Sequence, residues 1–268
     1  MLTIKPIESI QIGQIQLCMI IDRETVFKKS LFEDIEKYPE KLALLPNGQT
    51  FGVVRSFLVR TADRCALIDT GYGSEAGGKT LQILQKAGVK PEEITDVLLT
   101  HLDGDHIGGM VEAGNPIFQN ATVRLSHAEY EAWIEKGVGR APQSIEKARS
   151  TLALYQNRIE TFEFDSQILP GVTARDARGH TMGHTRYDLY SEGHALSIVG
   201  DIFHAYPLQL RFTDQSSAYD NDPIKAANVR ESMLKEFSQN DRLVCGTHVH
   251  PWGKVMRSPK GGYDFESQ

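Results

Sequence analysis

The sequence predicts an α/β progression of strands and helices in a single domain that covers residues 1–268. Apolar runs typical of strands alternate with segments of helical periodicity, as in the strand at 66–68, the helix at 77–87 and the strand at 97–99. Internal repeats, low-complexity tracts and linker-like stretches are absent from the sequence. At this length, one large domain can bury an ample core.

The first fifty residues divide into two parts. Residues 3–22 read as strands, because apolar and polar residues alternate there, and Gly13 can mark a turn. In residues 26–50, apolar side chains are scattered among Lys and Glu, and Pro39 and Pro46 interrupt the run. We therefore expect a lid or pocket-lining segment with one short helix and no sheet strand. Its aromatic residues either line a substrate pocket or pack on the body of the protein.

From residue 53 onward the strand pattern is clearer. Strands are expected at 53–54, 57–59 and 66–68, and a hairpin turn at 61–64 joins the last two. The strand at 66–68 ends in Asp69, whose charge needs partners. Asp69 either lies beside the loop that starts at Thr100 or caps a turn. The remaining expected elements are strands at 121–125, 159–164, 172–176, 195–199 and 243–245, helices at 128–136, 145–155 and 222–239, and a terminal hairpin at 252–268.

Composition excludes several classes of partner. The formal net charge is −6, which argues against nucleic acid and anionic membranes. No stretch approaches the ~20 apolar residues of a membrane helix, and the first 22 residues lack the pattern of a signal peptide. The cysteines are three, widely spaced and without a CxxC pair, so we expect no disulfide and a cytoplasmic location.

One loop concentrates potential metal ligands. The stretch from Thr100 to Gly109 follows an apolar strand, and it holds two imidazoles and two carboxylates within six positions: His101, Asp103, Asp105 and His106. This mixture of ligands suits zinc, iron or manganese. The alternative is a polar surface loop that happens to be rich in His and Asp.

Three further strand ends carry His or Asp beside glycine. They read Gly179-His180, Gly200-Asp201 and Gly246-Thr247-His248. Glycine allows the backbone to approach a crowded centre. Any one of these residues alone is more often structural, but four ligand-bearing strand ends indicate a common site.

The set resembles the metallo-β-lactamase superfamily from about Val53 to the C-terminus. The family signature is H-x-H-x-D-H, followed by a His in a GHT-x-GH context, an Asp after a strand and a His after another strand. The strand leading to Asp69-Thr70-Gly71 matches as well, and the later segments are most similar to methyl-parathion-hydrolase-type and lactonase-type members. The resemblance implies an α+β fold, a four-layer αβ/βα sandwich with two mixed sheets flanked by helices. It also implies two divalent metal ions held by His101, Asp103 and His180, by Asp105, His106 and His248, and by Asp201 as the bridge.

Asp103 departs from the signature, because this chain reads HxDxDH where the family has HxHxDH. The carboxylate either coordinates a metal or is too short to reach it. Zinc is the commonest metal in the family, but a carboxylate is a harder ligand than imidazole and raises the expectation of iron or manganese.

The resemblance implies a metallo-hydrolase that uses a metal-bound hydroxide to cleave an ester, with Asp105 accepting a proton. His204 either polarises a carbonyl and protonates a leaving group or is a surface residue, and His184 is expected to support the ligands. A lactone is the first substrate choice, and phosphotriesters or aryl esters are alternatives. A diiron redox protein and a non-catalytic metal-binding protein are rivals from other classes. The shape of the substrate pocket is expected to depend on residues 26–50, 137–145 and 204–222, and a homodimer is an option.

Overall fold

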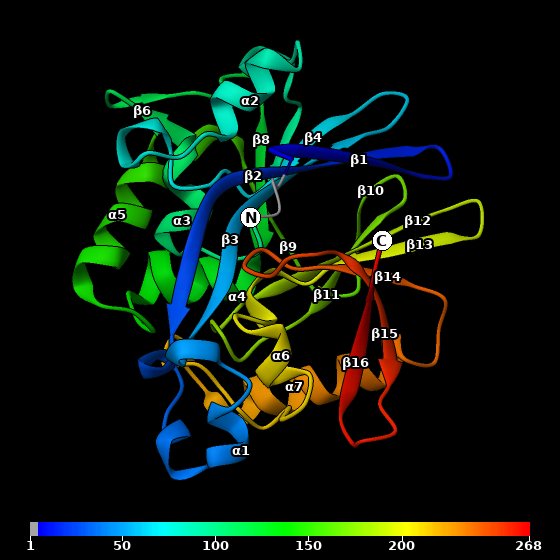
Figure 1. Cartoon of the computed structure of the whole chain (residues 1–268). Coiled ribbons are helices and arrows are strands. Elements are labelled where there is room, and N and C mark those ends of the chain that lie inside the picture. Colours follow the sequence, from blue (N-terminus) through cyan, green and yellow to red (C-terminus); the bar gives the residue numbers. More distant parts are fainter. Residues whose placement is uncertain (1–4) are drawn as a thin grey trace.

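Two seven-stranded sheets pack face to face in the computed structural model, which describes residues 5–268 (Figure 1). The first sheet has the strand order β1-β2-β3-β4-β5-β8-β9. Its strands are β1 (Ile7–Ile12), β2 (Ile15–Lys28), β3 (Gln49–Arg60), β4 (Cys65–Ile68), β5 (Asp96–Leu98), β8 (Thr122–Ser126) and β9 (Ile159–Phe162).

In the second sheet, the order of the strands is the same as their order in the sequence, from β10 to β16. Its strands are β10 (Gln167–Leu169), β11 (Val172–Asp176), β12 (Thr185–Ser191), β13 (His194–Ile198), β14 (Leu243–Cys245), β15 (Gly253–Arg257) and β16 (Tyr263–Ser267). A small separate hairpin pairs β6 (Val111–Glu112) with β7 (Asn115–Pro116). Both large sheets mix parallel and antiparallel pairs, because β4-β5 and β13-β14 are parallel.

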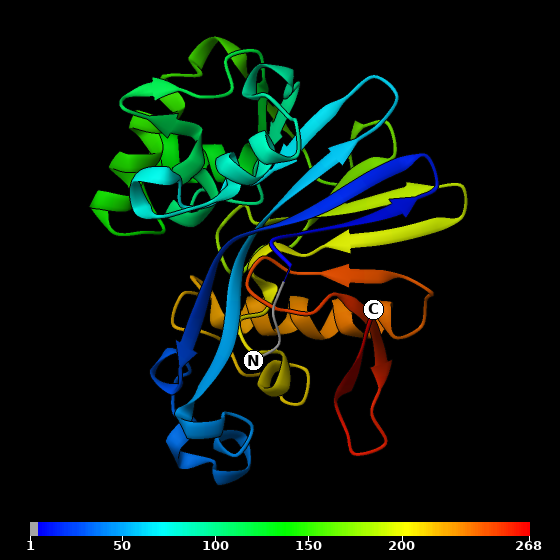
Figure 2. The same cartoon turned by 45° about the horizontal axis from the view of Figure 1, so that its top comes forward.

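Helices cover the outer face of each sheet (Figures 1 and 2). On the first sheet lie α2 (Thr80–Lys86), α3 (Gly104–Ile107), α4 (His127–Tyr130) and α5 (Pro142–Ala153), and on the second lie α6 (Tyr206–Gln209) and α7 (Pro223–Phe237). A π-helical turn at Glu131–Lys136 continues α4. The short helix α1 (Pro39–Leu42) lies apart, near the tip of the β2–β3 pair.

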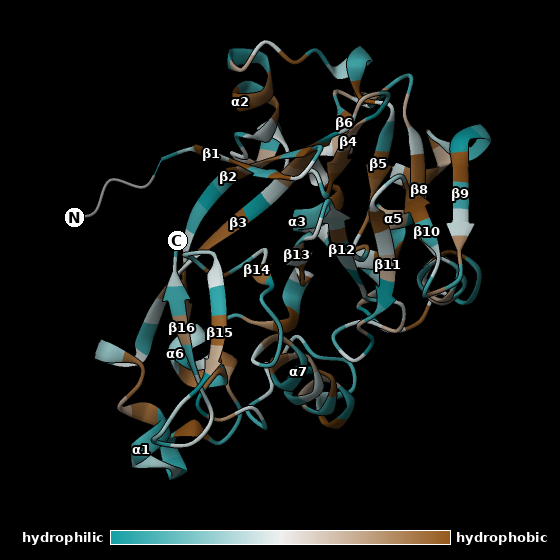
Figure 3. Ribbon diagram, turned by 90° about the vertical axis from the view of Figure 1, so that its right-hand side faces the viewer, coloured by the Kyte–Doolittle hydropathy of each residue, from teal (hydrophilic) through white to brown (hydrophobic). Residues whose placement is uncertain are grey.

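Alternation along the strands builds the layers. In β3, Leu58 packs with the helices of the first sheet, whereas Phe57 and Val59 face the second sheet. Successive side chains of a strand point to opposite faces, so one strand serves two cores. The strand β8 shows the same alternation, because its buried residues Val123 and Leu125 are separated by the half-buried Arg124 (Figure 3). This arrangement confirms the predicted four-layer αβ/βα sandwich.

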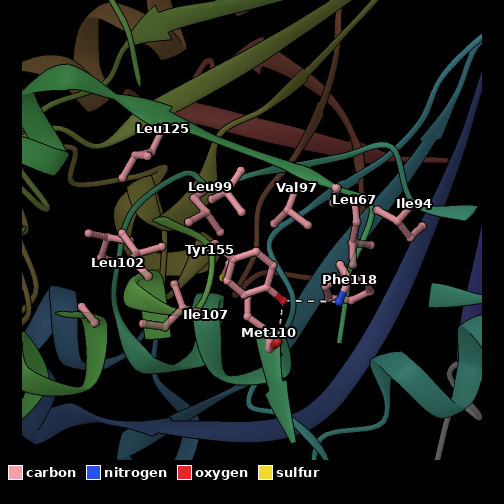
Figure 4. Packing of buried hydrophobic residues seen from close by; sticks show 14 of the residues in the cluster. Leu67, Ile94, Val97, Leu99, Leu102, Ile107, Met110, Phe118, Leu125 and Tyr155 are labelled. Carbon is pink, nitrogen blue, oxygen red and sulfur yellow. Dashed lines mark hydrogen bonds between the residues drawn. The ribbon is translucent and has the colours of Figure 1, made fainter. Parts of the chain in front are cut away.

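The core beneath the first sheet shows how a buried polar group is satisfied. Tyr155 is 1% exposed, and its hydroxyl donates to the Met110 carbonyl at 2.7 Å and accepts from the Phe118 N–H at 3.3 Å (Figure 4). Leu99, Leu102 and Ile107 belong to the same hydrophobic cluster, on either side of the potential ligands of the first loop. The core therefore anchors this loop at several points.

The interpretation of residues 26–50 is corrected by the structure. Residues 26–28 end β2 and residues 49–50 begin β3, and the two strands pair along their whole length as an arm that extends beyond the sheet (Figure 2). At the tip, Leu31, Phe32 and Leu45 pack against Leu208 of α6. Only the first residues of the segment line the cleft described below.

Smaller departures concern element boundaries. The strand β12 is absent from the expected elements, and the two strands expected at 53–59 form one longer strand, β3. The predicted strand region at 3–22 became β1 and most of β2, while residues 3 and 4 lie outside the described part. Within residues 5–268, no helix has both the length and the apolar character needed to cross a membrane.

Candidate metal centre

Four strand ends meet at one edge of the sandwich. The loops that follow the two parallel pairs, β4-β5 and β13-β14, lie together there, because the carboxyl ends of parallel strands share an edge. The loop between β11 and β12 joins them and carries His180. All seven residues predicted as ligands come together at this edge, in overlapping groups whose donor atoms lie within 4.8 Å of one another: His101, Asp103, Asp105, His106, His180, Asp201 and His248.

We call the first subsite the group His101, Asp103, His180 and Asp201. Asp103 Oδ2 lies 3.3 Å from His101 Nε2 and 3.4 Å from His180 Nε2. Asp201 Oδ2 lies 3.7 and 3.5 Å from the same two nitrogens. Ligands about 2.0–2.2 Å from a tetrahedral ion are separated by roughly 3.3–3.6 Å, so these four atoms have the spacing of one coordination shell. Asp103 is therefore long enough to reach the point that the histidines share.

We call the second subsite the group Asp105, His106, Asp201 and His248. His106 Nε2 lies 3.3 Å from Asp201 Oδ1, and His248 Nε2 lies 3.4 Å from Asp105 Oδ2. The two oxygens of Asp201 thus face different groups of nitrogens, although Oδ2 also approaches His248 Nε2 at 2.8 Å. Asp201 thus contacts imidazole nitrogens of both subsites, and its role as the bridge between two metal ions stays a prediction.

Hydrogen bonds fix the orientation of all four imidazoles. The Nδ1 atom of His106 bonds to Asp69 at 2.8 Å, and that of His180 bonds to Asp220 at 2.9 Å. An acceptor on Nδ1 sets the tautomer and leaves Nε2 free to coordinate. In the other two rings, Nδ1 bonds to the Thr100 hydroxyl (His101, 3.0 Å) and to the Val53 carbonyl (His248, 3.1 Å).

Unpaired buried atoms support a fit to metal. Within residues 5–268, His101 Nε2, His106 Nε2 and Asp201 Oδ1 have no hydrogen-bond partner although they are fully buried. A buried polar atom without a partner costs about 1–3 kcal/mol, and three of them converge here. Carboxylates also raise the pKa of His180 to about 9 against the effect of burial, mainly through Asp103 and Asp220. The site thus attracts positive charge.

His184 supports the bridging carboxylate. It lies four residues after His180, is fully buried, and bonds through Nδ1 to the Ala177 carbonyl at 3.0 Å. Its Nε2 accepts the backbone N–H of Asp201 at 3.1 Å. Burial lowers the pKa of His184 to about 4, which keeps this acceptor unprotonated at neutral pH. This contact is the supporting role expected from the sequence.

His204 is buried and faces the site. It is 1% exposed, which excludes the surface alternative, and neither ring nitrogen has a hydrogen-bond partner within the described residues. Its ring stacks on His248 with a centroid separation of 4.9 Å, and Nε2 lies 3.9 Å from Asp201 Oδ2. Burial, and then the charge of His248, lower the pKa of His204 well below its usual range. His204 therefore places a neutral imidazole beside Asp201 of the first subsite.

A cleft of about 460 Å³ opens over both subsites. Asp103, Asp105 and Asp201 form part of its floor, and its walls include the side chains of Val26, Phe27, Tyr72, Arg140 and Tyr219. Each of the three segments expected to shape the pocket contributes to its lining. Val26 and Phe27 come from the arm, Arg140 from the 137–145 loop, and Tyr219 from residues 204–222.

Several residues of the site gave no recognisable signal in the sequence. Arg140 binds Asp103 through Nε and Nη2 at 2.8 and 2.7 Å, and Asp220 orients His180. Glu129 is buried and accepts the backbone N–H groups of Leu102 and Gly183 at 3.1 and 2.8 Å. These residues lie tens of positions from their partners, and a single charged residue in a loop predicts no partner.

Fold and site together define an αβ/βα sandwich that carries a cluster of histidines and carboxylates at one edge of its sheets. The chain belongs to the metallo-beta-lactamase superfamily, whose sequence model matches residues 49–248. That match covers both subsites in full.

Named relatives are lactonases. An N-acyl homoserine lactonase from Bacillus cereus is 28% identical over 150 residues, which are 48% of this chain and 54% of the relative. The N-acyl homoserine lactonase AiiA from Bacillus thuringiensis subsp. kurstaki is 26% identical over 168 residues, 54% of this chain and 59% of the relative. The chain thus spans about half the length of the curated relatives it matches.

Solved structures resemble the chain over nearly its whole length. The hydrolase AbOPH of the beta lactamase superfamily superposes with a TM-score of 0.89 at 27% identity, covering 99% of this chain and 98% of its own. AidC, a dizinc quorum-quenching lactonase, has a TM-score of 0.85 at 22% identity, with coverage of 98% and 97%. At that identity, the likeness to AidC establishes the fold alone.

Proposed function

We propose that this protein is a metal-dependent hydrolase that cleaves an ester bond, with a lactone as the substrate class. The observation that carries the proposal is the set of orphaned, buried donor atoms that converge on two points beneath an open cleft. The lactonase relatives support the choice of a cyclic ester.

The donor set suits two divalent ions, which the residues of the first and second subsites would hold, with Asp201 common to both groups of residues. Bound there, such ions would supply a nucleophile at neutral pH and would withdraw electrons from the substrate carbonyl oxygen. Zinc fits the histidine-rich composition and the dizinc neighbour AidC, while the third carboxylate, Asp103, favours iron or manganese more than a purely His-based subsite does.

Three residues of the chain are assigned the proton transfer, the hydrogen bonding to substrate and the positioning of the subsites. Asp105 lines the cleft and its side chain is partly exposed, and we assign to it the role of accepting a proton during attack. His204 Nε2 lies 3.9 Å from Asp201 Oδ2, and this imidazole can donate a hydrogen bond to a carbonyl or to the departing oxygen. Asp201 fixes the relative position of the two subsites.

The cleft fits a small ester with an apolar substituent. Val26, Phe27 and Tyr219 provide an apolar and aromatic wall beside the charged floor. Such walls bury the apolar part of a ligand, while a few polar groups orient its reactive bond. The three carboxylates of the floor disfavour an anionic substrate unless bound cations offset their charge.

The test is a panel assay with metal quantification. Purified protein is stripped with a chelator, dialysed, and reconstituted separately with zinc, manganese, iron and cobalt. Lactones, aryl esters and phosphotriesters are then offered to each preparation. We expect lactone turnover to disappear on chelation and to return with at least one metal.

Other outcomes decide between the remaining classes. Faster turnover of phosphotriesters or aryl esters than of lactones would change the assigned substrate class but not the assignment as a metal-dependent hydrolase. Iron binding with oxygen or peroxide consumption and no ester cleavage would establish the redox reading. Metal binding without turnover of any substrate would favour a binding protein. Asp103→Ala tests the ligand set, because unchanged metal content and unchanged turnover would remove Asp103 from it.

A further inference from the structure

Arg140 pairs with only one of the three carboxylates on the floor of the cleft, among the residues that the structure describes. Its guanidinium binds both oxygens of Asp103, with Nε 2.8 Å from Oδ1 and Nη2 2.7 Å from Oδ2. Within residues 5–268, Asp105 and Asp201 form ion pairs with histidines only. The one carboxylate that departs from the family signature is therefore also the one that pairs with an arginine.

The contacts of Arg140 tie three loops together. Besides Asp103, Nη2 lies 3.3 Å from the His180 carbonyl oxygen, and Nη1 lies 3.3 Å from the Gly139 carbonyl oxygen. The two hydrogens of Nη2 are thus directed at two oxygens. His180 Nε2 lies 3.4 Å from Nη2, and because Asp220 bonds to the other ring nitrogen, Nε2 is the nitrogen left to face a metal.

A bidentate pair leaves the carboxylate able to bind a second cation. Each carboxylate oxygen has two lone pairs, and the planar fork of arginine occupies one on each oxygen. The second lone pair of Asp103 Oδ2 remains on the side of His101 Nε2 and His180 Nε2, at 3.3 and 3.4 Å. Without the fork, the Asp103 side chain, which is one-fifth exposed, is free to rotate toward water.

We propose that Arg140 is a positioning residue for the first subsite: it holds Asp103 in the orientation of a metal ligand and balances the added negative charge. The proposal rests on the proposed function, because it assumes that the first subsite binds a metal. Asp103 and Arg140 together present one ligand atom with no net charge, as a neutral imidazole does. The Asp103–Arg140 pair, and not Asp103 alone, thus takes the place of the histidine in the family signature.

Arg140→Lys separates geometry from charge. Lysine keeps the positive charge but has no planar fork, so Asp103 loses its fixed orientation. Loss of a residue that orients a ligand typically weakens metal binding by about 10–100-fold. We expect that loss at the first subsite and a change below about threefold at the second. Arg149→Lys is the matched control, because Arg149 bonds to the Ile134 carbonyl and touches no ligand.

The measurement is a titration of chelator-stripped protein with Zn²⁺ alone, and with Mn²⁺ alone, in competition with a chromophoric chelator. The affinities of the two subsites are read without any substrate. Urea unfolding of the stripped variants establishes that each one folds. Equal first-subsite affinity in wild type and Arg140→Lys overturns the proposal. Tighter binding in Arg140→Ala than in wild type also overturns it, because Arg140 would then act as a competing cation.

A double-mutant cycle makes the assignment specific. In an Asp103→His background no carboxylate needs orientation, so adding Arg140→Lys should change first-subsite affinity by less than about threefold. An undiminished effect in that background would show that Arg140 acts on His180 or on the loop in general. If the wild-type protein binds neither ion, the proposed function fails. If wild type binds both equivalents and the Arg140 variants match it, only this inference fails.

Discussion

The Asp69 carboxylate binds Nδ1 of His106 at 2.8 Å while the same oxygen accepts the hydroxyl of Thr100 at 2.8 Å. Its other oxygen accepts the Thr100 backbone N–H at 2.9 Å. Asp69 is fully buried at the end of β4. It therefore connects two neighbouring strand ends and aims a ligand at the second subsite, so of the two sequence-based interpretations the contact with the ligand loop is the observed one.

Asp69→Asn should weaken both the fold and the second subsite. An amide has one acceptor oxygen, so one of the buried donors loses its partner, at about 1–3 kcal/mol of unfolding free energy. Weaker orientation of His106 should lower second-subsite affinity about 10–100-fold. Urea unfolding and Zn²⁺ titration measure the two effects.

Asp22→Asn is the control for Asp69→Asn. Asp22 is also fully buried and accepts the backbone N–H groups of Tyr72, Lys79 and Thr80, but it touches no ligand. It should lose comparable stability with unchanged metal affinity. Equal metal affinity in both variants would reduce Asp69 to a turn cap.

His204→Phe should separate function from stability. The ring nitrogens of His204 are buried without partners among the described residues, so an apolar ring removes that penalty and should leave the unfolding free energy unchanged or raise it by about 1–2 kcal/mol. If His204 assists a carbonyl or a leaving group, turnover should fall about 100-fold or more. Urea denaturation and ester hydrolysis are measured on the same preparation. Lower stability with normal turnover would assign His204 to packing.

The potential ligands could be predicted from the sequence because each lies in a loop that follows a strand and within three residues of a glycine. Such a pattern is local, and parallel pairing brings the strand ends together whatever the distance along the chain. Arg140 and Asp220 had no local pattern. They are identified as partners only when the 137–145 loop and the 217–222 turn are placed beside the subsites, which depends on long-range packing.

The arm formed by β2 and β3 could not be predicted for a different physical reason. Residues 17–22 of β2 form a continuously buried and mainly apolar run, but residues 23–28 extend beyond the sheet and are mostly exposed on both faces. Exposure removes the requirement for apolar side chains, so the strand pattern fades while the backbone pairing continues to Lys28 and Gln49. Pairing, which sequence patterning does not reveal, determines the structure there.

Glu129→Gln should change how stability depends on pH. Burial raises the pKa of Glu129 to about 7 despite hydrogen bonds from Thr181, Leu102 and Gly183. A folded-state pKa above the unfolded value of 4.5 means that the favourable contribution is complete below about pH 4.5 and is lost as pH rises through 7. Wild type should therefore lose about 3 kcal/mol from this group between pH 4.5 and about 8.

The readout for Glu129 is the difference in unfolding free energy between Glu129→Gln and wild type, measured in urea on metal-stripped protein. The amide does not titrate, so the variant should gain relative to wild type by about 3 kcal/mol over that pH interval. An unpaired backbone N–H in the variant adds a constant offset and leaves the slope unchanged. A difference that stays flat with pH would show that the Glu129 carboxyl is ionised throughout.

Gly73→Ala and Gly77→Ala form a matched pair that tests how closely the loop after β4 approaches the first ligand loop. Both glycines have φ of +82°, so both alanines carry the same strain of a left-handed backbone, on the order of 1 kcal/mol. A Cβ on Gly73 would lie 2.4 Å from the Gly108 carbonyl oxygen, whereas a Cβ on Gly77 would have no atom of the described chain within 4 Å.

The difference between these two variants isolates the contact, because the strain cancels. Backbone cannot give way as a flexible side chain does, so Gly73→Ala should lose a further 1–3 kcal/mol of unfolding free energy in urea. Displacement of Gly108, two residues after His106, should also weaken Zn²⁺ binding at the second subsite, while Gly77→Ala binds as wild type does. Equal stability and equal Zn²⁺ affinity in the two variants would show that the two loops can separate without disturbing the site.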